Sequence, residues 1–485
     1  MNRIKEKGVA LILTLILLLV LSVMAVSLMF LSQTETWSSM NYRLTSQARD
    51  GAEAGVNSAA NFLMFSYTPP ASGGNDPLTA YTMTASPVTY AGNPVVLSAN
   101  SNATSNYPLA SAQTSFNTAG QGSLTAGYTT VNYAPYATLL SMQQVTPYGS
   151  TTPVTIQTWQ ITSDGNISGV RNAQVEVSAI LERPVTPVFN YAAFATSNGC
   201  SALTFGGGGT TDSYDSSTVV NGSVSTQAYG GNVGTNGNLT EVGSPTTING
   251  SLSTPRTGVG TCTANNVTAW TDTSGRVTGG LVELPQPIVY PTPVIPAPGT
   301  TDLSLSKNWS CPTGGSAIPG CTSSGGNIYL PPGAYGNINI TGQANLHVSA
   351  GTYNINSFQE QSAQSGLIVD SGPVIFNVTG NNVSGSVVQL TGNSVQNPSL
   401  NPMNFQILYA GTGTVSLKGN TQASGLLYAP NASFSFAGQS DWYGAVIGRT
   451  MSDMGGAAVH YDRRLQRQAY RVGEYYLSSF TWKKY

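Results

Sequence analysis

The sequence predicts a mainly β protein that begins with one long α-helix, continues with antiparallel strands and ends in a parallel β-helix or β-solenoid. Three observations predict this fold class. Apolar or small side chains recur at helical spacing from position 9 to about position 65, short alternating segments follow, and motifs in the second half recur at a nearly constant spacing.

The composition limits the classes of function. Only 8% of the 485 residues are charged, and 18 Lys and Arg residues are balanced by 20 Asp and Glu residues. The chain therefore lacks the basic field that neutralises phosphates, and we expect no nucleic-acid partner. A hydrophobic fraction of 40% is too high for a disordered polar chain. We expect a folded and nearly neutral protein.

A membrane-spanning helix is expected near the start of the chain. Arg3, Lys5 and Lys7 precede an apolar run over residues 9–31. As a helix this run would be about 35 Å long, enough to cross a hydrocarbon layer of roughly 30 Å. The basic flank should stay in the cytoplasm and the rest of the chain should lie outside. A cleaved secretory signal is the alternative, although apolar character continues past its cleavage-like residues 23–25.

The helix is expected to continue to about residue 65. Arg49 and Glu53 stand four positions apart and support a helix, and the first proline is Pro69. Apolar or small side chains keep a helical stripe after the membrane run, at Trp37, Met40, Leu44, Ala48, Ala52, Val56, Ala60 and Leu63. The helix 9–65 should be apolar all round in its first half and amphipathic in its second half.

The amino-terminal residues resemble a known family. Lys-Gly-Val-Ala-Leu at 7–11, Gln-Ala-Arg at 47–49 and Ala-Glu-Ala-Gly at 52–55 are similar to the amino-terminal region of PilX-type type IV minor pilins. The resemblance covers roughly residues 5–65. It implies that prepilin peptidase removes a basic leader, residues 1–8, by cutting between Gly8 and Val9, and that the apolar helix later packs in the core of a pilus.

Two positions depart from the pattern of major pilins. Those usually carry phenylalanine first and glutamate fifth after the cut, whereas this chain has Val9 and Leu13 there. The glutamate normally pairs with the terminal amine of a neighbouring subunit, which offsets the cost of both charges in an apolar setting. Because Leu13 cannot do so, the departure favours a minor, priming or tip-located subunit over a bulk fibre subunit.

Residues 66–190 are expected to form a pilin-like β region. Residues 155–162 and 173–181 alternate between apolar and polar side chains, and Asp-Gly-Asn at 164–166 is a turn signal between them. This pattern predicts two antiparallel strands. The apolar stripe of the helix needs such a sheet to cover it.

Residues 191–450 are expected to form a β-solenoid region. Pro-Gly-Ala-Tyr at 332–335 recurs as Ala-Gly-Thr-Tyr at 350–353, and residues 415–425 recur at 434–444. Each unit holds short alternating strands with Gly or Asn at the corners, where positive φ is needed. Stacked turns of this length bury one continuous apolar column.

Two further segments differ from the repeats. Residues 284–299 contain six prolines and should be extended and semi-rigid, either separating two domains or running along one solenoid. Residues 451–485 alternate Arg and Lys with Tyr and Leu. We expect them to cap the last coil, since an open solenoid end exposes strand edges. A basic contact surface for another pilus component is the alternative.

The four cysteines are expected to form disulfides, because the topology places them outside the cytoplasm. The short loop between Cys311 and Cys321 favours that pair, which leaves Cys200 with Cys262, although three pairings are possible. No Cys-x-x-Cys sequence occurs, so no metal site is expected.

No catalytic residue and no cofactor are expected. Parallel β-helices often resemble polysaccharide lyases and hydrolases, which need converging carboxylates. Each acidic candidate also suits a turn or a corner, and no phosphate-binding loop is present. The candidates are Asp212, Asp215, Asp370 and Asp441, with Lys418 nearly one coil before Asp441.

The sequence therefore predicts a minor pilin-like subunit for assembly of a type IV pilus or pseudopilus. The precursor would reside in the inner membrane and then join the pilus or the cell surface, with prepilin peptidase, other pilins and pilus assembly components as partners. A tip-located solenoid would adhere to a surface or glycan ligand through exposed Tyr and Asn. The alternatives are a membrane-anchored glycan-active β-helix enzyme and a passive envelope structural protein.

Overall fold

The computed structural model describes residues 6–126, 129–169, 171–391, 395–418, 422–439, 441–453 and 455–485. The chain divides into two compact units. Unit 1 consists of Met1–Val145, Pro153–Val185 and Val472–Tyr485, and unit 2 consists of Thr146–Thr152 and Thr186–Arg471. The chain thus returns to unit 1 after completing unit 2, so the units are not the consecutive blocks 66–190 and 191–450 expected from the sequence.

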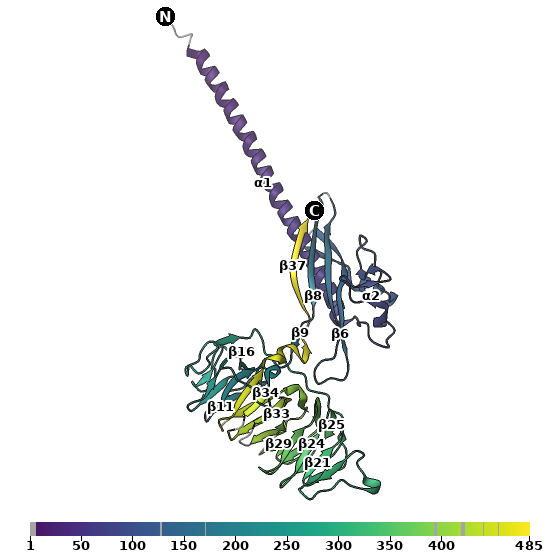
Figure 1. The fold of residues 1–485 in the computed structure, drawn as a ribbon. Coiled ribbons are helices and arrows are strands. Elements are labelled where there is room, and N and C mark those ends of the chain that lie inside the picture. The colour runs from purple at the N-terminus through teal and green to yellow at the C-terminus, as the bar shows by residue number, and fades with distance from the viewer. Residues whose placement is uncertain are drawn as a thin grey trace. The chain divides into compact units, whose positions relative to one another are not determined.

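Unit 1 is built on helix α1 (Glu6–Phe65), whose second half packs on an antiparallel sheet (Figure 1). The strand order is β37-β8-β7-β6-β4, and β5 pairs with β6. The bounds are β4 Val96–Ser98, β5 Gly122–Ala126, β6 Thr129–Val145, β7 Val154–Ile167, β8 Ala173–Glu182 and β37 Tyr476–Lys484. The buried stripe of α1, including Ala48, Ala52 and Val56, joins Trp159 and Val177 in one core. The sheet is the cover that the stripe needs.

The smaller elements of unit 1 lie before β6. Helix α2 (Ala110–Gly120) buries Phe116, whose ring meets that of Phe62 of α1 edge to face at 5.5 Å. A three-stranded sheet follows the 3₁₀ helix η1 (Leu78–Ala80) and consists of β1 Tyr81–Thr82, β2 Thr89–Tyr90 and β3 Asn93–Pro94. These elements extend the core of unit 1 beyond the central sheet.

The prediction of a turn at residues 164–166 is wrong, because all three residues lie inside β7 and pair with β8. Gly165 stands opposite Val175 and faces α1, where an added Cβ would lie only 1.9 Å from the carbonyl oxygen of Ala48. The glycine therefore serves close packing of the helix on the sheet, a role that a strand glycine can also have. The connection between the strands comes later, after Ile167.

Unit 2 contains a sheet of 21 strands among the described residues, nearly all of them parallel. Its strands are β10 Ala193–Ala195, β11 Leu203–Gly206, β12 Thr210–Tyr214, β13 Val233–Thr235, β14 Leu239–Val242, β15 Thr247–Ile248, β16 Leu252–Thr254, β17 Asn266–Val267, β18 Leu281–Glu283, β19 Leu303–Leu305, β22 Gly333–Ala334, β23 Asn337–Ile340, β25 Gly351–Ile355, β26 Ser357–Glu360, β28 Val374–Val378, β29 Ser386–Thr391, β31 Phe405–Tyr409, β32 Thr414–Lys418, β33 Gln422–Ala437, β34 Asp441–Asp453 and β35 Ala458–Asp462.

A second sheet of five strands completes part of the solenoid wall, in the order β20-β21-β24-β27-β30. Its bounds are β20 Thr322–Ser324, β21 Asn327–Leu330, β24 Asn345–Val348, β27 Gly366–Val369 and β30 Val395–Gln396. β9 (Val185–Pro187) and β36 (Tyr470–Val472) form a two-stranded sheet. The remaining 3₁₀ helices are η2 Ser216–Thr218, η3 Gly314–Ser316, η4 Pro402–Asn404 and η5 Arg463–Arg467.

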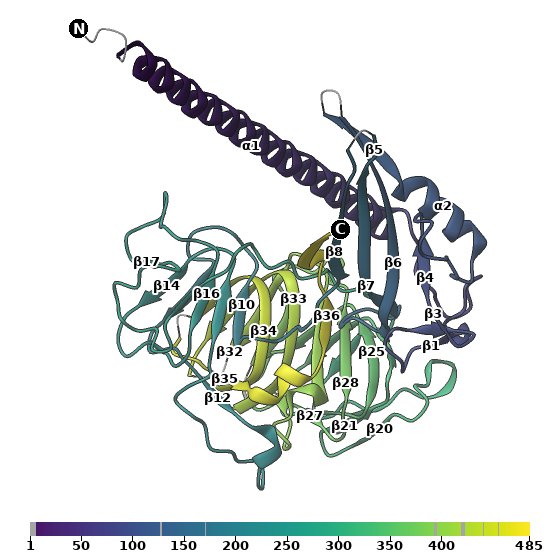
Figure 2. The ribbon, with the colours of Figure 1, turned by 90° about the horizontal axis from the view of Figure 1, so that it is seen from above.

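The coils of unit 2 do not stack in chain order. β10 pairs in parallel with β13 on one side and with β34 on the other, and β12 pairs with β15 and β35 in the same way. The first coil, residues 193–214, therefore lies between a coil that follows it directly and the last coil, residues 441–462. Figure 2 shows β34 between β10 and β33.

The proline-rich segment 284–299 runs along this solenoid. Asn236 exchanges two hydrogen bonds of 2.8 Å with the backbone of Ile288, and the Tyr428 hydroxyl donates to the carbonyl of Pro291 at 2.6 Å. Immediately after the segment, Thr301 accepts a hydrogen bond from the amide of Gly336, at the other end of the stack. The segment therefore runs along one solenoid and does not separate two domains.

One of the two sequence repeats matches the stacking and the other does not, because Gly333 stands opposite Tyr353 and not opposite Gly351. Val415 stands opposite Phe434 and Gly425 opposite Gly444, which is the same alignment that relates the two copies of the motif in the sequence. In the five-stranded sheet Asn327 stands opposite Asn345, one coil later in the chain. Within the stack, side-chain amides of successive coils bond to one another, as between Asn354 and Asn377 at 2.9 Å. Such ladders satisfy polar groups that the coil packing removes from water.

Residues 451–485 do not form one cap on the last coil. β35 belongs to the parallel sheet of unit 2, whereas β37 pairs antiparallel with β8 in the sheet of unit 1. The alternation of Tyr, Leu and Trp with polar residues in the last segment suits an edge strand, and β8 offers the sheet edge on which it pairs.

Candidate functional site

The first half of α1 exposes its whole apolar surface. Every large apolar side chain from residue 9 to residue 31 is between 44% and 66% exposed. Fully burying such a side chain contributes roughly 1.5–3 kcal/mol, so lipid or other protein must cover this segment. Among the described residues, α1 is the one helix that is long and apolar enough to cross a membrane.

The polar residues inside this segment are already satisfied. The hydroxyls of Thr14, Ser22 and Ser27 donate to carbonyls four residues earlier in the same helix, at 3.0, 2.7 and 2.8 Å. A hydroxyl bonded to its own backbone adds little cost in an apolar environment. The segment can therefore lie in a bilayer or against other apolar helices without leaving a polar group unpaired.

Burial on α1 begins at Leu44 and continues on the face that meets the sheet. Arg49 Nε and Glu53 Oε1 form the expected pair at 2.7 Å on a partly exposed flank of the helix, where Arg49 lies over the ring of Trp482 of β37. The helix thus changes from a fully exposed apolar rod to an ordinary amphipathic helix along its length (Figure 1). This change separates an insertion segment from a segment that anchors the rest of unit 1.

The expected leader lies at the start of this helix. Residues 1–5 are outside the described part of the chain, and residues 6–8 form the first turn of α1. The side chains of Val9 and Leu13 are both exposed. Leu13 therefore stands on the surface of the insertion segment and presents no charge.

The cysteines of unit 2 form two disulfides. Cys200 is bonded to Cys262 and Cys311 to Cys321, with sequence separations of 62 and 10 residues. The first bond ties the loop before β11 to a long excursion between β16 and β17. The second closes a loop beside β20. Both lie in the part of the chain that the helix topology would send out of the cytoplasm.

Two of the candidate acids flank one histidine. His460 Nδ1 lies 2.5 Å from Asp212 Oδ1, and its Nε2 lies 3.7 Å from Asp441 Oδ1. The ring of Tyr443 covers the imidazole at 4.3 Å. Burial alone would lower the pKa of His460, but the hydrogen bond to Asp212 and the nearby Asp441 carboxylate raise it to about 9. The imidazole is therefore charged at neutral pH.

The other histidine has a similar environment. His347 Nδ1 lies 2.9 Å from Asp370 Oδ1, and its ring stacks on Tyr329 at 4.3 Å. In both clusters the tyrosine stands opposite the histidine on the neighbouring strand. Sequence reasoning missed this Tyr-His-Asp arrangement. Its signal was a tyrosine about one coil before each histidine in the chain.

The remaining candidates have separate positions. Asp215 caps η2 by accepting a hydrogen bond of 2.9 Å from the amide of Ser217. Lys418 and Asp441 line the same small cavity of about 10 Å³, which has room for a water molecule but not for a sugar ring. The candidate acids therefore do not gather in one cleft. Among the described residues, no three His, Cys, Asp or Glu side chains are placed to hold a metal ion.

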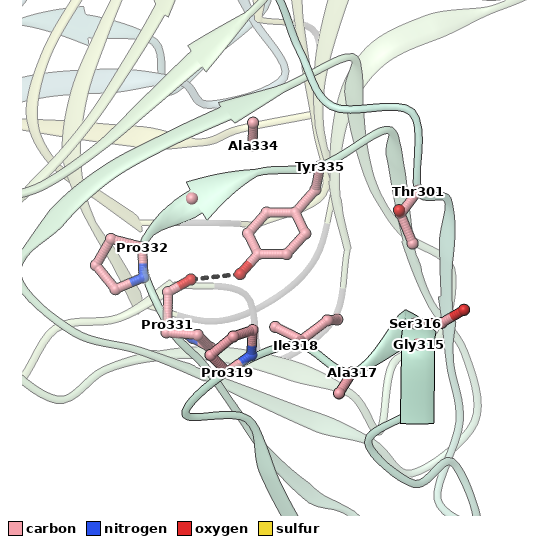
Figure 3. A pocket seen from close by; sticks show the side chains of 11 residues that line it. Thr301, Gly315, Ser316, Ala317, Ile318, Pro319, Pro331, Pro332, Ala334 and Tyr335 are labelled. Carbon is pink, nitrogen blue, oxygen red and sulfur yellow. Dashed lines mark hydrogen bonds between the residues drawn. The ribbon is translucent and has the colours of Figure 1, made fainter. Parts of the chain in front are cut away.

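A larger pocket of about 490 Å³ lies between the loop closed by Cys311–Cys321 and the corner at residues 331–335 (Figure 3). Its walls include Ile318, Pro319 and Tyr335. The Tyr335 hydroxyl donates to the carbonyl of Pro331 at 2.6 Å, and burial raises the pKa of Tyr335 to about 12. None of the side chains that line the pocket is a carboxylate, an amine or an imidazole, so the pocket presents no strong acid or base.

A long helix with an exposed apolar half, packed by its second half on an antiparallel sheet, is the arrangement that the resemblance to type IV pilins predicts. Residues 7–57 match the model of the PilX N-terminal family. The amino-terminal region of the chain is thus similar to the PilX N-terminal family, and a large carboxy-terminal domain follows it. Residues 321–468, inside unit 2, match a domain of unknown function, DUF7305.

The crystal structure of the competence-associated pilin ComZ from Thermus thermophilus is similar to this chain at 13% sequence identity, over 91% of this chain and 98% of that one. The TM-score is 0.33, and at that value the likeness carries no argument about fold or function. No curated protein matches this chain in sequence.

Proposed function

We propose that the protein is a minor subunit of a type IV pilus or pseudopilus. The observation that carries the proposal is the coincidence of two features: the PilX N-terminal match at residues 7–57, and an apolar segment that α1 leaves completely uncovered. Lipid covers the segment in the precursor, and neighbouring helices cover it in the assembled filament. Both environments remove the same apolar surface from water.

Leader removal precedes assembly in this proposal. Prepilin peptidase cuts between Gly8 and Val9 on the cytoplasmic side of the inner membrane, where the basic residues of the leader remain. Glycine before the cut leaves the backbone open to close approach by the enzyme. The new amino terminus at Val9 then begins an uninterrupted apolar rod.

The missing acid at Leu13 supports a minor position. A major subunit pairs its glutamate with the amine of a neighbour, and repeats that contact along the fibre. Leu13 is exposed and apolar, so it packs but provides no charge partner. A subunit at the tip or at the start of assembly needs fewer such contacts than one inside the fibre.

Expression of the full chain with prepilin peptidase, followed by sequencing of the mature amino terminus, tests the processing step. We expect a start at Val9. Gly8→Leu should block the cut, whereas Val9→Phe, which introduces the residue that major pilins usually carry, should preserve it. A mature start after residues 23–25 would instead indicate a secretory signal peptide and overturn the proposal.

We also propose that unit 2 acts as the displayed, adhesive part. The support is a set of exposed aromatic side chains, Tyr229, Trp270 and Tyr329, which are 55%, 68% and 43% exposed. Exposed aromatic faces suit sugar rings. Binding of the filaments to immobilised neutral glycans should fall with Trp270→Ala. Release of sugar products that disappears with Asp441→Asn would favour the glycan-cleaving alternative.

A further inference from the structure

A pocket of about 320 Å³ lies in unit 1, beside the point of α1 where burial begins. Met40 and Arg43 of α1 line one side of it, and Ser168 and Arg171, which follow β7, line the other. Thr129, at the start of β6, also lines the pocket. The fold thus brings two arginines from distant parts of the sequence to one cavity.

The two arginines have no acidic partner. The described residues that line the pocket include no Asp and no Glu. Within the same described set, Arg43 forms no ion pair or hydrogen bond, and Arg171 makes a cation–π contact in which its Cζ lies 5.3 Å from the centroid of the Trp37 ring. Each guanidinium group presents a fork of donors that matches a phosphate or a carboxylate. The pocket therefore suits an anion.

The pocket lies close to the end of the insertion segment. Trp37 is six residues after Leu31, which is about 9 Å farther along the helix. The polar headgroup layer is roughly 5–8 Å thick on each side of the hydrocarbon core. Because helical side chains lean toward the amino terminus, the Trp37 ring and the Arg171 guanidinium over it can reach this layer. A lipid headgroup at this level lies directly beside the pocket.

Exposed apolar surface connects the insertion segment with the pocket. The side chain of Trp37 is 58% exposed and that of Met40 is 37% exposed, and both follow the uncovered residues 9–31 on the same helix. A free anion gains nothing from this surface. A lipid gains from it, because its acyl chains can lie against α1 while its headgroup enters the pocket.

We propose that this pocket binds the headgroup of an anionic phospholipid of the phosphatidylglycerol type. The phosphate oxygens accept hydrogen bonds from Arg43 and Arg171, and the headgroup alcohol pairs with the hydroxyls of Thr129 and Ser168. A zwitterionic headgroup brings an ammonium group of its own, which the two arginines repel. The inference rests on the membrane-anchored precursor of the proposed function.

Native mass spectrometry of the full-length chain tests the site. The chain is released from neutral detergent micelles that contain phosphatidylglycerol and phosphatidylcholine in equal amounts. We expect a preference of roughly tenfold or more for phosphatidylglycerol, since each basic side chain near the surface adds about fivefold. The double variant Arg43→Gln with Arg171→Gln should retain one phosphatidylglycerol fewer than the parent chain. Lipids held by the basic leader are common to both chains and cancel in this comparison.

Arg256→Gln with Arg464→Gln is the matched control. It removes the same charge from unit 2, and neither residue lines the pocket. This control should retain as many phosphatidylglycerol molecules as the parent chain. The unfolding temperature in phosphatidylcholine micelles should be the same for the parent chain and the pocket variant, because neither pocket arginine has an ion pair to lose within the described residues. A second pocket variant, Arg43→Lys with Arg171→Lys, keeps the charge and should retain the lipid more weakly than the parent.

Equal retention of phosphatidylglycerol by the parent chain and the Gln pocket variant would overturn the proposal. An equal loss in the unit 2 control would also overturn it, because net charge and not the pocket would then decide binding. If glycerol phosphate, the soluble headgroup, is bound as tightly as the lipid, the assignment to a membrane lipid is wrong. Filaments that lack the polypeptide, together with an intact lipid preference, would contradict the role as a pilus subunit and support the lipid site.

Discussion

Asp212 and His460 lie 248 positions apart in the chain, yet Asp212 Oδ1 is 2.5 Å from His460 Nδ1. The contact joins β12 of the first coil to β35 of the last. The returning chain therefore closes the solenoid against its own starting coil through a largely buried charged pair. Removing one member of such a pair leaves the other charge without a partner, which is strongly destabilising.

The stabilising contribution of the Asp212–His460 contact should be lost at alkaline pH. The pKa of His460 is about 9 in the folded chain, above its unperturbed value of 6.5. Its contribution to stability is therefore complete below about pH 6.5 and is lost as the pH rises through about 9. Urea unfolding between pH 6 and pH 10 should show this loss. His460→Asn should destabilise unit 2 by about 3 kcal/mol at pH 7 and remove the dependence.

His347→Asn is the comparison variant for this test. Its partner Asp370 is 39% exposed, against 16% for Asp212, so water can replace the lost partner. We expect a smaller loss of stability from this substitution. Equal losses from the two variants, with an unchanged alkaline profile in His460→Asn, would contradict the special role of the Asp212–His460 contact.

Glu360 should make the solenoid less stable as the pH rises. Its side chain is fully buried at the end of β26, and this burial raises the pKa of Glu360 to about 8, against 4.5 in the unfolded chain. The stabilising effect of its proton is present below about pH 4.5 and is lost as the pH rises through about 8. Glu360→Gln should therefore stabilise the protein by roughly 1–3 kcal/mol at pH 9 and by little at pH 4.5.

Chemical unfolding of the parent chain and Glu360→Gln at these two pH values measures the difference. The amide retains a group that can accept from the Thr391 amide, which lies 2.9 Å from Glu360 Oε2. The exposed Glu283→Gln variant should show no such difference between the two pH values. A parent chain that is more stable than Glu360→Gln at pH 9 would contradict the prediction.

Gly165 should be essential for the packing of α1 on its sheet. An alanine Cβ at this position would lie 1.9 Å from the Ala48 carbonyl oxygen, so helix and strand would have to separate. Gly165→Ala should destabilise unit 1 by about 3 kcal/mol or more. Gly74→Ala provides the control, because its Cβ would meet no heavy atom nearer than 3.5 Å. Comparable unfolding temperatures for the two variants would argue against the close helix contact.

The two disulfides should differ in their contribution to stability. In the chain-entropy model, closing a loop of 62 residues contributes about 4 kcal/mol and closing one of 10 residues about 3 kcal/mol. Replacing Cys200 and Cys262 together by serine should therefore lower stability more than replacing Cys311 and Cys321 together. Denaturant unfolding of the two double variants makes the comparison, and the opposite ranking would contradict it.

Local patterns predicted the local elements. The spacing of apolar residues predicted a helix over 9–65, and α1 is Glu6–Phe65; alternation predicted strands near 155–162 and 173–181, and these are β7 and β8. The repeat at 415–425 and 434–444 predicted stacked coils, and its spacing coincides with the register of β32, β33 and β34. Each of these features depends on side chains close together in the sequence or on a repeat that aligns directly.

The order of the coils could not be predicted in this way. Nothing in the residues of β10 indicates that one of its neighbours is β34, because parallel pairing is set by where the chain returns. The same holds for the pairing of β37 with β8. Tertiary contact also decided the role of Gly165, whose local sequence favours a turn.

Composition analysis of sheared and purified filaments tests the central proposal most directly. The account predicts that they contain this polypeptide, beginning at Val9, and that Leu18→Arg removes it from the filaments by placing a charge in the apolar rod. A Leu18→Met variant should assemble normally. If the filaments lack the parent polypeptide while it remains in the membrane fraction, the proposed role as a pilus subunit is contradicted.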